Sequence, residues 1–215
     1  SSKFYPYYTQ VIPDGCWYGC TLACAKAVDG LELRTGPYKG QKVSVDGPEY
    51  ETIAGGSNMS LWYPHWVLEF NFYCDTYGID TISFGTATAF AMECYEAGLL
   101  DAEKTGGLEL RFGNGDAVVQ MVNKIARREG LGDILAEGTA RIARHFGAPE
   151  LAMTVKDQAI PAYDPRGLKG MGIGFVSTAG LTLLQASNAP AEIGRATSAA
   201  APDPLAPVIA PPGAA

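Results

Sequence analysis

Residues 64–78 read P-H-W-V-L-E-F-N-F-Y-C-D-T-Y-G, and this stretch predicts the class of fold. Pro64 suits the first turn of a helix, where the amide hydrogen that proline lacks would have no partner within the helix. Apolar residues then recur at helical spacing, and Gly78 is typical of the position that follows a helix end. The sequence therefore predicts a helix over residues 64–77.

Three further helical regions are expected on the C-terminal side of this helix. The first covers residues 80–97, and the second is capped by Asp116 and closes at Gly130. Asp133 is expected to cap the last region, which ends at Gly147. Because these regions dominate the middle of the chain, the predicted fold class is mainly α, an irregular helical domain with short β segments.

Residues 14–26 read D-G-C-W-Y-G-C-T-L-A-C-A-K and carry three of the five cysteines. Cys16, Cys20 and Cys24 are spaced by four, which on a helix places them near one stripe and on a looser turn still lets three sulfurs converge. We expect this stretch to open a helix that ends near Gly30. Clustered thiolates select iron–sulfur centres, zinc or Cu(I), although cysteine also occurs as a small buried apolar residue. The regular spacing favours a metal site.

The remaining ordered segments are expected to be short strands and turns. Residues 31–45 alternate around glycines and predict a hairpin or an irregular ribbon. Residues 47–52, G-P-E-Y-E-T, predict a turn that leads into a helix start, and residues 151–162 are expected to be extended.

The C-terminal tail has a different composition from the rest of the chain. From Thr182 onward it is rich in alanine and proline, lacks aromatic residues and has almost no charge. Such a composition cannot form a packed core and predicts a disordered tail. The expected division is therefore a helical domain over residues 1–181 and a low-complexity tail over residues 182–215.

Composition limits the classes of function. The net charge of −7 argues against binding to nucleic acid, which requires a basic face. No apolar run is long enough for a membrane span, and the first residues do not have the pattern of a signal peptide. Five cysteines without an export signal fit a reducing compartment, so a cytoplasmic protein is expected.

Several short motifs succeed one another along the chain. After the cysteine stretch and G-P-E-Y-E-T come C-D-T-Y-G-I-D-T-I-S from Cys74, F-A-M-E-C-Y-E-A-G, A-R-R-E-G, L-A-E-G and P-A-Y-D-P-R-G. In this order they resemble the tungsten- or molybdenum-dependent aldehyde:ferredoxin oxidoreductase family. The resemblance covers residues 13–180 and is to the first helical domain of that family. The family's N-terminal base domain and its C-terminal helical domain have no counterpart in this chain.

The resemblance implies metal ligands for the cysteine stretch. Cys16, Cys20 and Cys24 would be three of the four ligands of a 4Fe-4S cluster. The fourth would come from a D-x-x-G-L-C motif that this chain does not contain. The family usually has two residues between its first two cysteines, whereas this chain has three.

The resemblance also implies a cofactor-binding motif at Asp75, Gly78, Ile79 and Asp80, which match the first pterin-binding motif of the family. A carboxylate can accept paired hydrogen bonds from the amino and ring N–H groups of a pterin. The alternative is a helix C-cap followed by an N-cap. The implied cofactor is a bis-pterin that carries tungsten or molybdenum.

Glu51 matches the proposed active-site carboxylate of the family. Oxidation of an aldehyde with water needs a base, and a partly desolvated glutamate can have its pKa raised toward neutrality for that purpose. The alternative is an ordinary acid in the first turn of a helix.

Other positions depart from the family or are explained by structure alone. Some members bind a lone iron through E-x-x-H and a later histidine. Here Glu69 is present, but Phe72 and Val119 occupy the histidine positions, so no such iron is expected. The two histidines, His65 and His145, are expected to be surface or packing residues. Two further cysteines lie on apolar helices and are interpreted as core thiols, namely Cys74 and Cys94.

By resemblance, the complete enzyme would oxidise an aldehyde to a carboxylic acid and pass electrons through the cluster to ferredoxin. Its partners would be ferredoxin, the aldehyde and the remaining domains of the enzyme. The sequence does not decide whether the enzyme is a homo-oligomer. The isolated chain is expected to be incomplete and inactive. The alternative function is a non-catalytic module that holds an iron–sulfur cluster or zinc on three cysteines.

Overall fold

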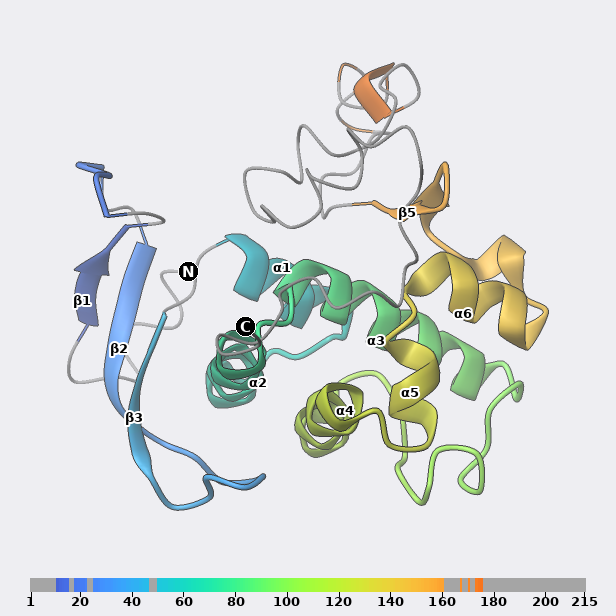
Figure 1. Cartoon of the computed structure of the whole chain (residues 1–215), viewed down its shortest axis with the longest axis horizontal. Helices are drawn as coiled ribbons and strands as arrows, with labels where there is room; N and C mark the ends of the chain where they lie inside the picture. The colour runs from blue at the N-terminus through green and yellow to red at the C-terminus, as the bar shows by residue number, and fades with distance from the viewer. Residues whose placement is uncertain are drawn as a thin grey trace, which may run out of the picture. The chain divides into compact units, whose positions relative to one another are not determined.

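The computed structural model describes residues 11–15, 18–22, 25–46, 50–160, 167, 170 and 173–175 (Figure 1), and of residues 11–14, 25 and 51 it describes the backbone alone. The chain divides into two compact units, Ser1–Ala162 and Tyr163–Ala215. Nearly all described residues belong to the first unit. The predicted tail over residues 182–215 lies outside the described residues, so the predicted domain division stays a prediction.

The first unit begins with a three-stranded antiparallel sheet in the order β1–β2–β3. Its strands are β1 (Val11–Asp14), β2 (Ala25–Glu32) and β3 (Lys42–Asp46). Strands β2 and β3 form the hairpin that was predicted for residues 31–45. In Figure 1 the sheet lies beside α2 (Pro64–Tyr77).

The helix predicted to run from the cysteine stretch to near Gly30 is wrong. Residues 18–22 form turns and bends, and β2 comes after them. Val28 and Leu31 are buried three residues apart, which is a helical spacing. The pairing with β3 shifts between these two residues, and Gly30 within the shift has φ +76°. A bulge that adds one residue lets both side chains reach the same face of a strand.

Helices make up most of the regular structure, so the predicted mainly α fold is confirmed. They are α1 (Tyr50–Asn58), α2, α3 (Thr81–Glu96), α4 (Gly115–Arg127), α5 (Leu131–Leu135) and α6 (Thr139–Phe146). A short 3-10 helix, η2 (Pro149–Leu151), precedes a small hairpin of β4 (Thr154–Val155) and β5 (Gln158–Ala159). The hairpin occupies part of the segment that was expected to be extended.

Helix α3 is the centre of the hydrophobic core. It is apolar on almost every side, as expected for a helix that is surrounded by others. Phe84, Phe90 and Met92 are at most 3% exposed. The helix contacts α1, α2, α4, α5 and α6, so it holds the helical part of the unit together.

Helix α2 connects the core to the sheet, and its predicted bounds are confirmed. Phe70 and Tyr73 belong to the main core cluster, whereas Leu68 packs with Val28 and Val45 of the sheet in a second cluster. The helix ends at Gly78, whose left-handed conformation (φ 69°, ψ 33°) is easy for glycine.

Two other predicted boundaries need correction. The cap of α4 is Asn114, whose side chain accepts a hydrogen bond from Ala117 N–H, rather than Asp116, which lies in the first turn. The region that was predicted to be capped by Asp133 and to end at Gly147 is two helices. The first, α5, has Gly130 as its N-cap and Asp133 in its first turn, and Gly138 with φ +85° interrupts the region before α6. A left-handed residue breaks the helical hydrogen-bond pattern, although the periodicity of apolar residues continues through it.

Helices α1 and α3 touch at two glycines, and this contact gives a stability prediction. A Cβ on Gly85 would lie 2.6 Å from Gly55 Cα. We expect Gly85→Ala to lower the free energy of unfolding by about 1–3 kcal/mol through overpacking, despite alanine's higher helix propensity. Urea unfolding followed by circular dichroism measures the change. Ser57→Ala, at an exposed position of α1, is the control and should change stability by less than about 0.5 kcal/mol. A variant as stable as the wild type would contradict the close contact.

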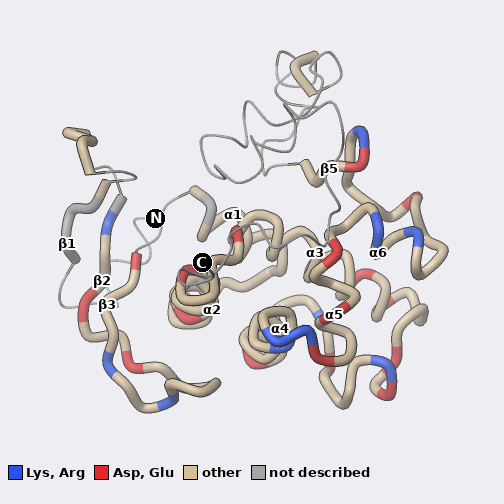
Figure 2. The backbone as a smooth tube through the Cα atoms, in the orientation of Figure 1, with Lys and Arg blue, Asp and Glu red and all other residues tan. Residues whose placement is uncertain are grey.

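Helix length and the distribution of charge can be stated for the described residues. Within the described ranges, no helix combines the length and the apolar content that crossing a bilayer requires. Figure 2 shows acidic and basic residues interspersed along the described backbone. The last turn of α4 carries Lys124 and Arg127, whereas its first turn carries Asp116.

Candidate functional site

The junction between α2 and α3 contains the predicted pterin-binding motif. At this junction the N–H groups of Gly78 and Ile79 donate to the carbonyl oxygens of Asp75 and Cys74, which closes the end of α2. Ile79 packs against the main core and anchors the turn. A Cβ on Gly78 would have no atom within 4 Å, so the backbone of the turn is open to an approaching group.

Asp80 is the N-cap of α3. Its Oδ2 accepts a hydrogen bond of 2.8 Å from Ser83 N–H, and the residue is half-buried. The cap geometry that was the alternative interpretation of this motif is therefore present. It occupies one carboxylate oxygen, and within the described residues Oδ1 accepts no hydrogen bond. Capping and ligand binding by Asp80 are thus compatible.

Asp75 is exposed in the last turn of α2 and is tied to two other segments through Asn71. The Asn71 amide nitrogen donates to Asp75 Oδ2 and to the Asp46 carbonyl, each at 3.2 Å. Thr52 Oγ1 donates to Asn71 Oδ1 at 3.0 Å. The Asn71 side chain therefore links the first turn of α1, which contains Glu51, to Asp75 of the predicted pterin-binding motif. The Glu51 side chain lies outside the described part of the chain.

The cysteine stretch connects β1 to β2, and Asp14 pairs with Ala25 across that connection. Cys20 is half-buried with a free thiol, whereas Cys16 and Cys24 lie outside the described residues. Among the residues that are described, no three His, Cys, Asp or Glu side chains are grouped to hold a metal ion. Since two of the three predicted ligands are not among those residues, the cluster stays a prediction.

The two core thiols are confirmed. Cys74 and Cys94 are fully buried. Burial raises the pKa of Cys74 well above its usual range and raises the pKa of Cys94 to about 11. Both therefore stay protonated near neutral pH, and metal binding requires the thiolate.

Glu69 forms a buried anchor that the sequence analysis did not predict. Its side chain is fully buried in α2, and Oε1 accepts hydrogen bonds from Thr35 N–H (2.8 Å), Thr35 Oγ1 (2.7 Å) and Arg34 N–H (3.1 Å). Oε2 lies 3.2 Å from His65 Nε2. The carboxylate thus holds the loop after β2 against α2, and His65 is a packing partner as expected. A glutamate between Leu68 and Phe70 in an apolar helix was the signal for this role.

The Glu69 anchor predicts a pH-dependent stability. Burial raises the pKa of Glu69, but the adjacent His65 imidazole and the hydrogen bonds from Thr35 and Arg34 outweigh it, so the pKa lies below the ordinary 4.5. The ionised form is therefore stabilising above about pH 4.5, and this contribution is lost as pH falls through the lower folded-state pKa. We expect Glu69→Gln to reduce the free energy of unfolding by about 1–3 kcal/mol at pH 7.

Urea unfolding of wild type and Glu69→Gln between pH 3 and pH 7 measures this effect. The difference between the two proteins should narrow below about pH 4. Glu96→Gln, at an exposed position of α3, is the control. Its free energy of unfolding should differ little from that of the wild type, and this difference should not narrow below about pH 4. A constant difference for Glu69→Gln across the range would contradict an ionised, hydrogen-bonded Glu69.

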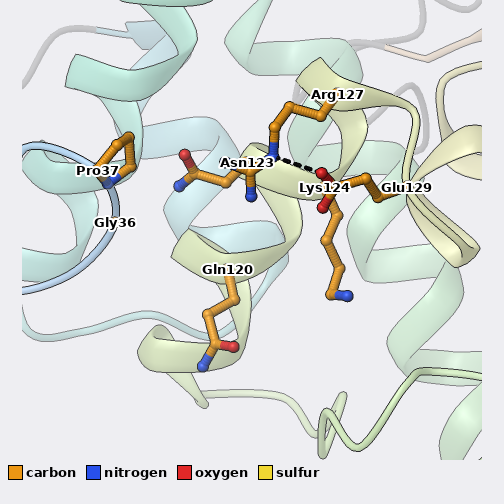
Figure 3. A pocket seen from close by; sticks show the side chains of 7 residues that line it. All are labelled: Gly36, Pro37, Gln120, Asn123, Lys124, Arg127 and Glu129. Atoms are coloured by element: carbon orange, nitrogen blue, oxygen red, sulfur yellow. Dashed lines mark ion pairs between the residues drawn. The ribbon is translucent and has the colours of Figure 1, made fainter.

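A cavity of about 330 Å³ lies between the loop after β2 and helix α4 (Figure 3). Its lining residues are Gly36, Pro37, Gln120, Asn123, Lys124, Arg127 and Glu129. Arg127 Nε pairs with Glu129 Oε1 at 2.9 Å, and Asn123 accepts a hydrogen bond from the Tyr77 hydroxyl at 2.7 Å. None of the predicted cofactor or cluster ligands lines this cavity, so we do not assign the cofactor to it.

Comparison with known proteins decides the family. Residues 6–206 match the family model described as aldehyde ferredoxin oxidoreductase, domains 2 and 3. The chain belongs to this family. The aldehyde ferredoxin oxidoreductase family is a family of oxidoreductase enzymes, so the predicted family and the predicted enzyme class are confirmed.

Tungsten-containing members are similar to this chain in sequence. The tungsten-containing aldehyde ferredoxin oxidoreductase of Pyrococcus furiosus is 43% identical over 162 residues, which cover 74% of this chain and 25% of that protein. The Pyrococcus abyssi protein of the same name is 48% identical over 136 residues, or 61% of this chain and 22% of that protein. This chain therefore spans about a quarter of the length of these relatives.

A solved structure resembles the chain in its fold. It is described as the active site complex BamBC of benzoyl coenzyme A reductase in complex with 1,5 dienoyl-CoA. The two chains superpose with a TM-score of 0.56 at 25% sequence identity, over 75% of this chain and 23% of that chain. A protein described as a benzoyl coenzyme A reductase therefore resembles this chain in fold. Because the fold alone does not identify the reaction, a proposed reaction must be argued from the site residues.

Proposed function

We propose that this chain is the cofactor- and cluster-binding part of an enzyme that oxidises an aldehyde to a carboxylic acid. The cofactor would be a bis-pterin with tungsten or molybdenum. The observation that carries the proposal is the α2–α3 junction, where exposed Asp75 and the open turn at Gly78 lie beside Asp80. One Asp80 oxygen caps α3, and the other accepts no hydrogen bond from the described residues. Carboxylate oxygens beside an accessible backbone suit the N–H groups along one edge of a pterin.

The chain's own contribution to the reaction would be binding and proton transfer. An aldehyde and one water give a carboxylic acid, two protons and two electrons, so a group that accepts a proton is needed beside the substrate. Glu51 would be this base, since the Thr52–Asn71–Asp75 contacts bring its helical turn to the pterin motif. The bound cofactor would supply the two-electron redox chemistry.

The cysteine stretch, residues 14–26 and here called the cysteine loop, would provide the exit for electrons. Cys16, Cys20 and Cys24 would hold a 4Fe-4S cluster with a fourth ligand from the remaining domains, and ferredoxin would accept the electrons one at a time. Tyr18 is fully exposed and Leu22 is 76% exposed in this loop. Such exposed apolar side chains are typical of surfaces that another protein part covers, and the remaining domains of the enzyme would cover them.

Asp80→Asn tests the cofactor part of this proposal. Asparagine is as good an N-cap as aspartate, so the change removes the charge and keeps the start of α3. The test protein is a chimeric enzyme in which this chain replaces the matching segment of the tungsten-containing P. furiosus relative. We expect tungsten and pterin contents to fall together by about tenfold, on the scale of one lost charge-assisted hydrogen bond, while iron content stays near normal.

The control for Asp80→Asn is Asp133→Asn, which makes the same charge change in the first turn of α5. Metal analysis and pterin fluorescence after oxidation measure the contents. Unchanged tungsten and pterin in Asp80→Asn would contradict the assignment of this motif. Equal losses in both variants would indicate a general defect in assembly.

A further inference from the structure

Asn71 occupies a position between the two parts of the proposed site. We propose that Asn71 is a positioning residue, which sets the helical turn that carries Glu51 relative to Asp75. This inference rests on the proposed function and adds to it a residue that touches neither the cofactor nor the substrate. The hydrogen bonds of the Asn71 side chain carry it.

The Asn71 amide joins the end of β3 and the first turn of α1 to its own helix, α2. Its nitrogen donates to the carbonyl of Asp46 at the end of β3 and to Asp75 Oδ2 one turn along α2. Its oxygen accepts from Thr52 in the first turn of α1. Asn71 is 2% exposed and Thr52 is fully buried, so water does not compete for these bonds.

The chemistry of the contacts selects asparagine. The site needs two N–H donors and one acceptor on a short side chain, and of the standard residues only asparagine meets this need without a longer stem. Aspartate would place a second carboxylate against Asp75 Oδ2, and leucine would leave the Thr52 hydroxyl and the Asp46 carbonyl without this partner.

Helix α1 is also held by a second contact, which does not involve Asn71. Helix α1 already packs on α3 through Gly55 and Gly85, where a Cβ on Gly85 would lie only 2.6 Å from Gly55 Cα. The bonds to Asp46 and Asp75 fix the orientation of the Asn71 amide, and the bond from Thr52 ties the first turn of α1 to that amide. This one directional contact restricts the rotation of α1 about its own axis. The direction of the Glu51 Cα–Cβ bond depends on that rotation.

The structure provides a matched pair of variants. Thr52→Val removes the hydroxyl that donates to Asn71. Thr88→Val makes the same change at another fully buried threonine, on α3, whose Oγ1 has no hydrogen-bond partner within the described residues. The two variants change shape and polarity equally, and only Thr52→Val removes a contact of the proposed network.

Hydrogen exchange of the full chain tests the geometry. Thr52→Val should increase the exchange rates of the amides of Ala54 to Gly56, which follow the first turn of α1 and are its first amides with partners inside the helix, by about fivefold. This is the scale of one buried hydrogen bond. Thr88→Val should leave these amides unchanged. Equal exchange rates in the two variants would overturn the proposal.

Kinetics of the chimeric enzyme test the positioning role. Thr52→Val should lower kcat by about tenfold to a hundredfold with KM, tungsten and pterin unchanged, because small displacements of a reacting group are costly. Thr88→Val should keep the wild-type kcat.

Asn71→Leu, which also releases Asp75, should lose pterin in addition, and the conservative Asn71→His should restore part of it. A Thr52→Val enzyme as active as Thr88→Val would overturn the role of Asn71, whereas normal turnover of Glu51→Gln would contradict the proposed function itself.

Discussion

Glu51→Gln is expected to lower kcat of the chimeric enzyme by about two to four orders of magnitude, the scale of a positioned general base. Glutamine keeps the size and the hydrogen-bonding ability of the side chain but cannot accept a proton at neutral pH. Glu51 lies in the first turn of α1, outside the proposed cofactor motif, so tungsten, pterin and iron contents should stay normal. Steady-state kinetics together with metal analysis therefore separate loss of the base from loss of the cofactor.

The alternative role of Glu51 is that of an acid that favours the helix N-terminus, which contributes about 0.3–1 kcal/mol to stability and nothing to turnover. Asp116→Asn is the matched control, because Asp116 is an acid in the first turn of α4. That control should keep full activity. Near-normal turnover of Glu51→Gln would make Glu51 equivalent to Asp116 and remove the proposed base.

The second large effect is expected at the cysteine loop. After anaerobic reconstitution with iron and sulfide, the chain should be brown and bind about four iron atoms. Cys20→Ser should lose most of that iron, since serine is a much poorer ligand for a soft metal centre than a thiolate. Iron and sulfide analysis with the visible absorption spectrum measures both results.

Cys94→Ala is the control for the cysteine loop, because Cys94 is a fully buried core thiol. Its iron content should equal that of the wild type. A chain that takes up a single zinc and refuses iron would contradict the cluster. The non-catalytic zinc module would then be the better account of this chain.

Local signals in the sequence predicted the helices well where the ends are chemically marked. Pro64 and Gly78 bound α2 as predicted, since a missing amide hydrogen and a left-handed residue act within one turn of the chain. Asn114 rather than Asp116 caps α4, because both residues are good caps and only the packed helix decides between them. The family was also evident from the order of short motifs in the sequence, as the matching family model shows.

The tertiary structure decided the parts that depend on distant residues. The cysteine stretch leads into a strand because β2 pairs with β1 and β3. The bulge at Gly30 places two buried residues three positions apart, which in the sequence is the spacing expected of a helix. Glu69 meets Thr35 across 34 residues, and Asn71 meets Thr52 across 19 residues. A buried carboxylate or amide must find hydrogen-bond partners wherever the fold supplies them, and local sequence does not contain their positions. The sequence by itself thus determined the family and those helices whose ends are chemically marked, and only packing determined how buried polar residues such as Glu69 and Asn71 are held.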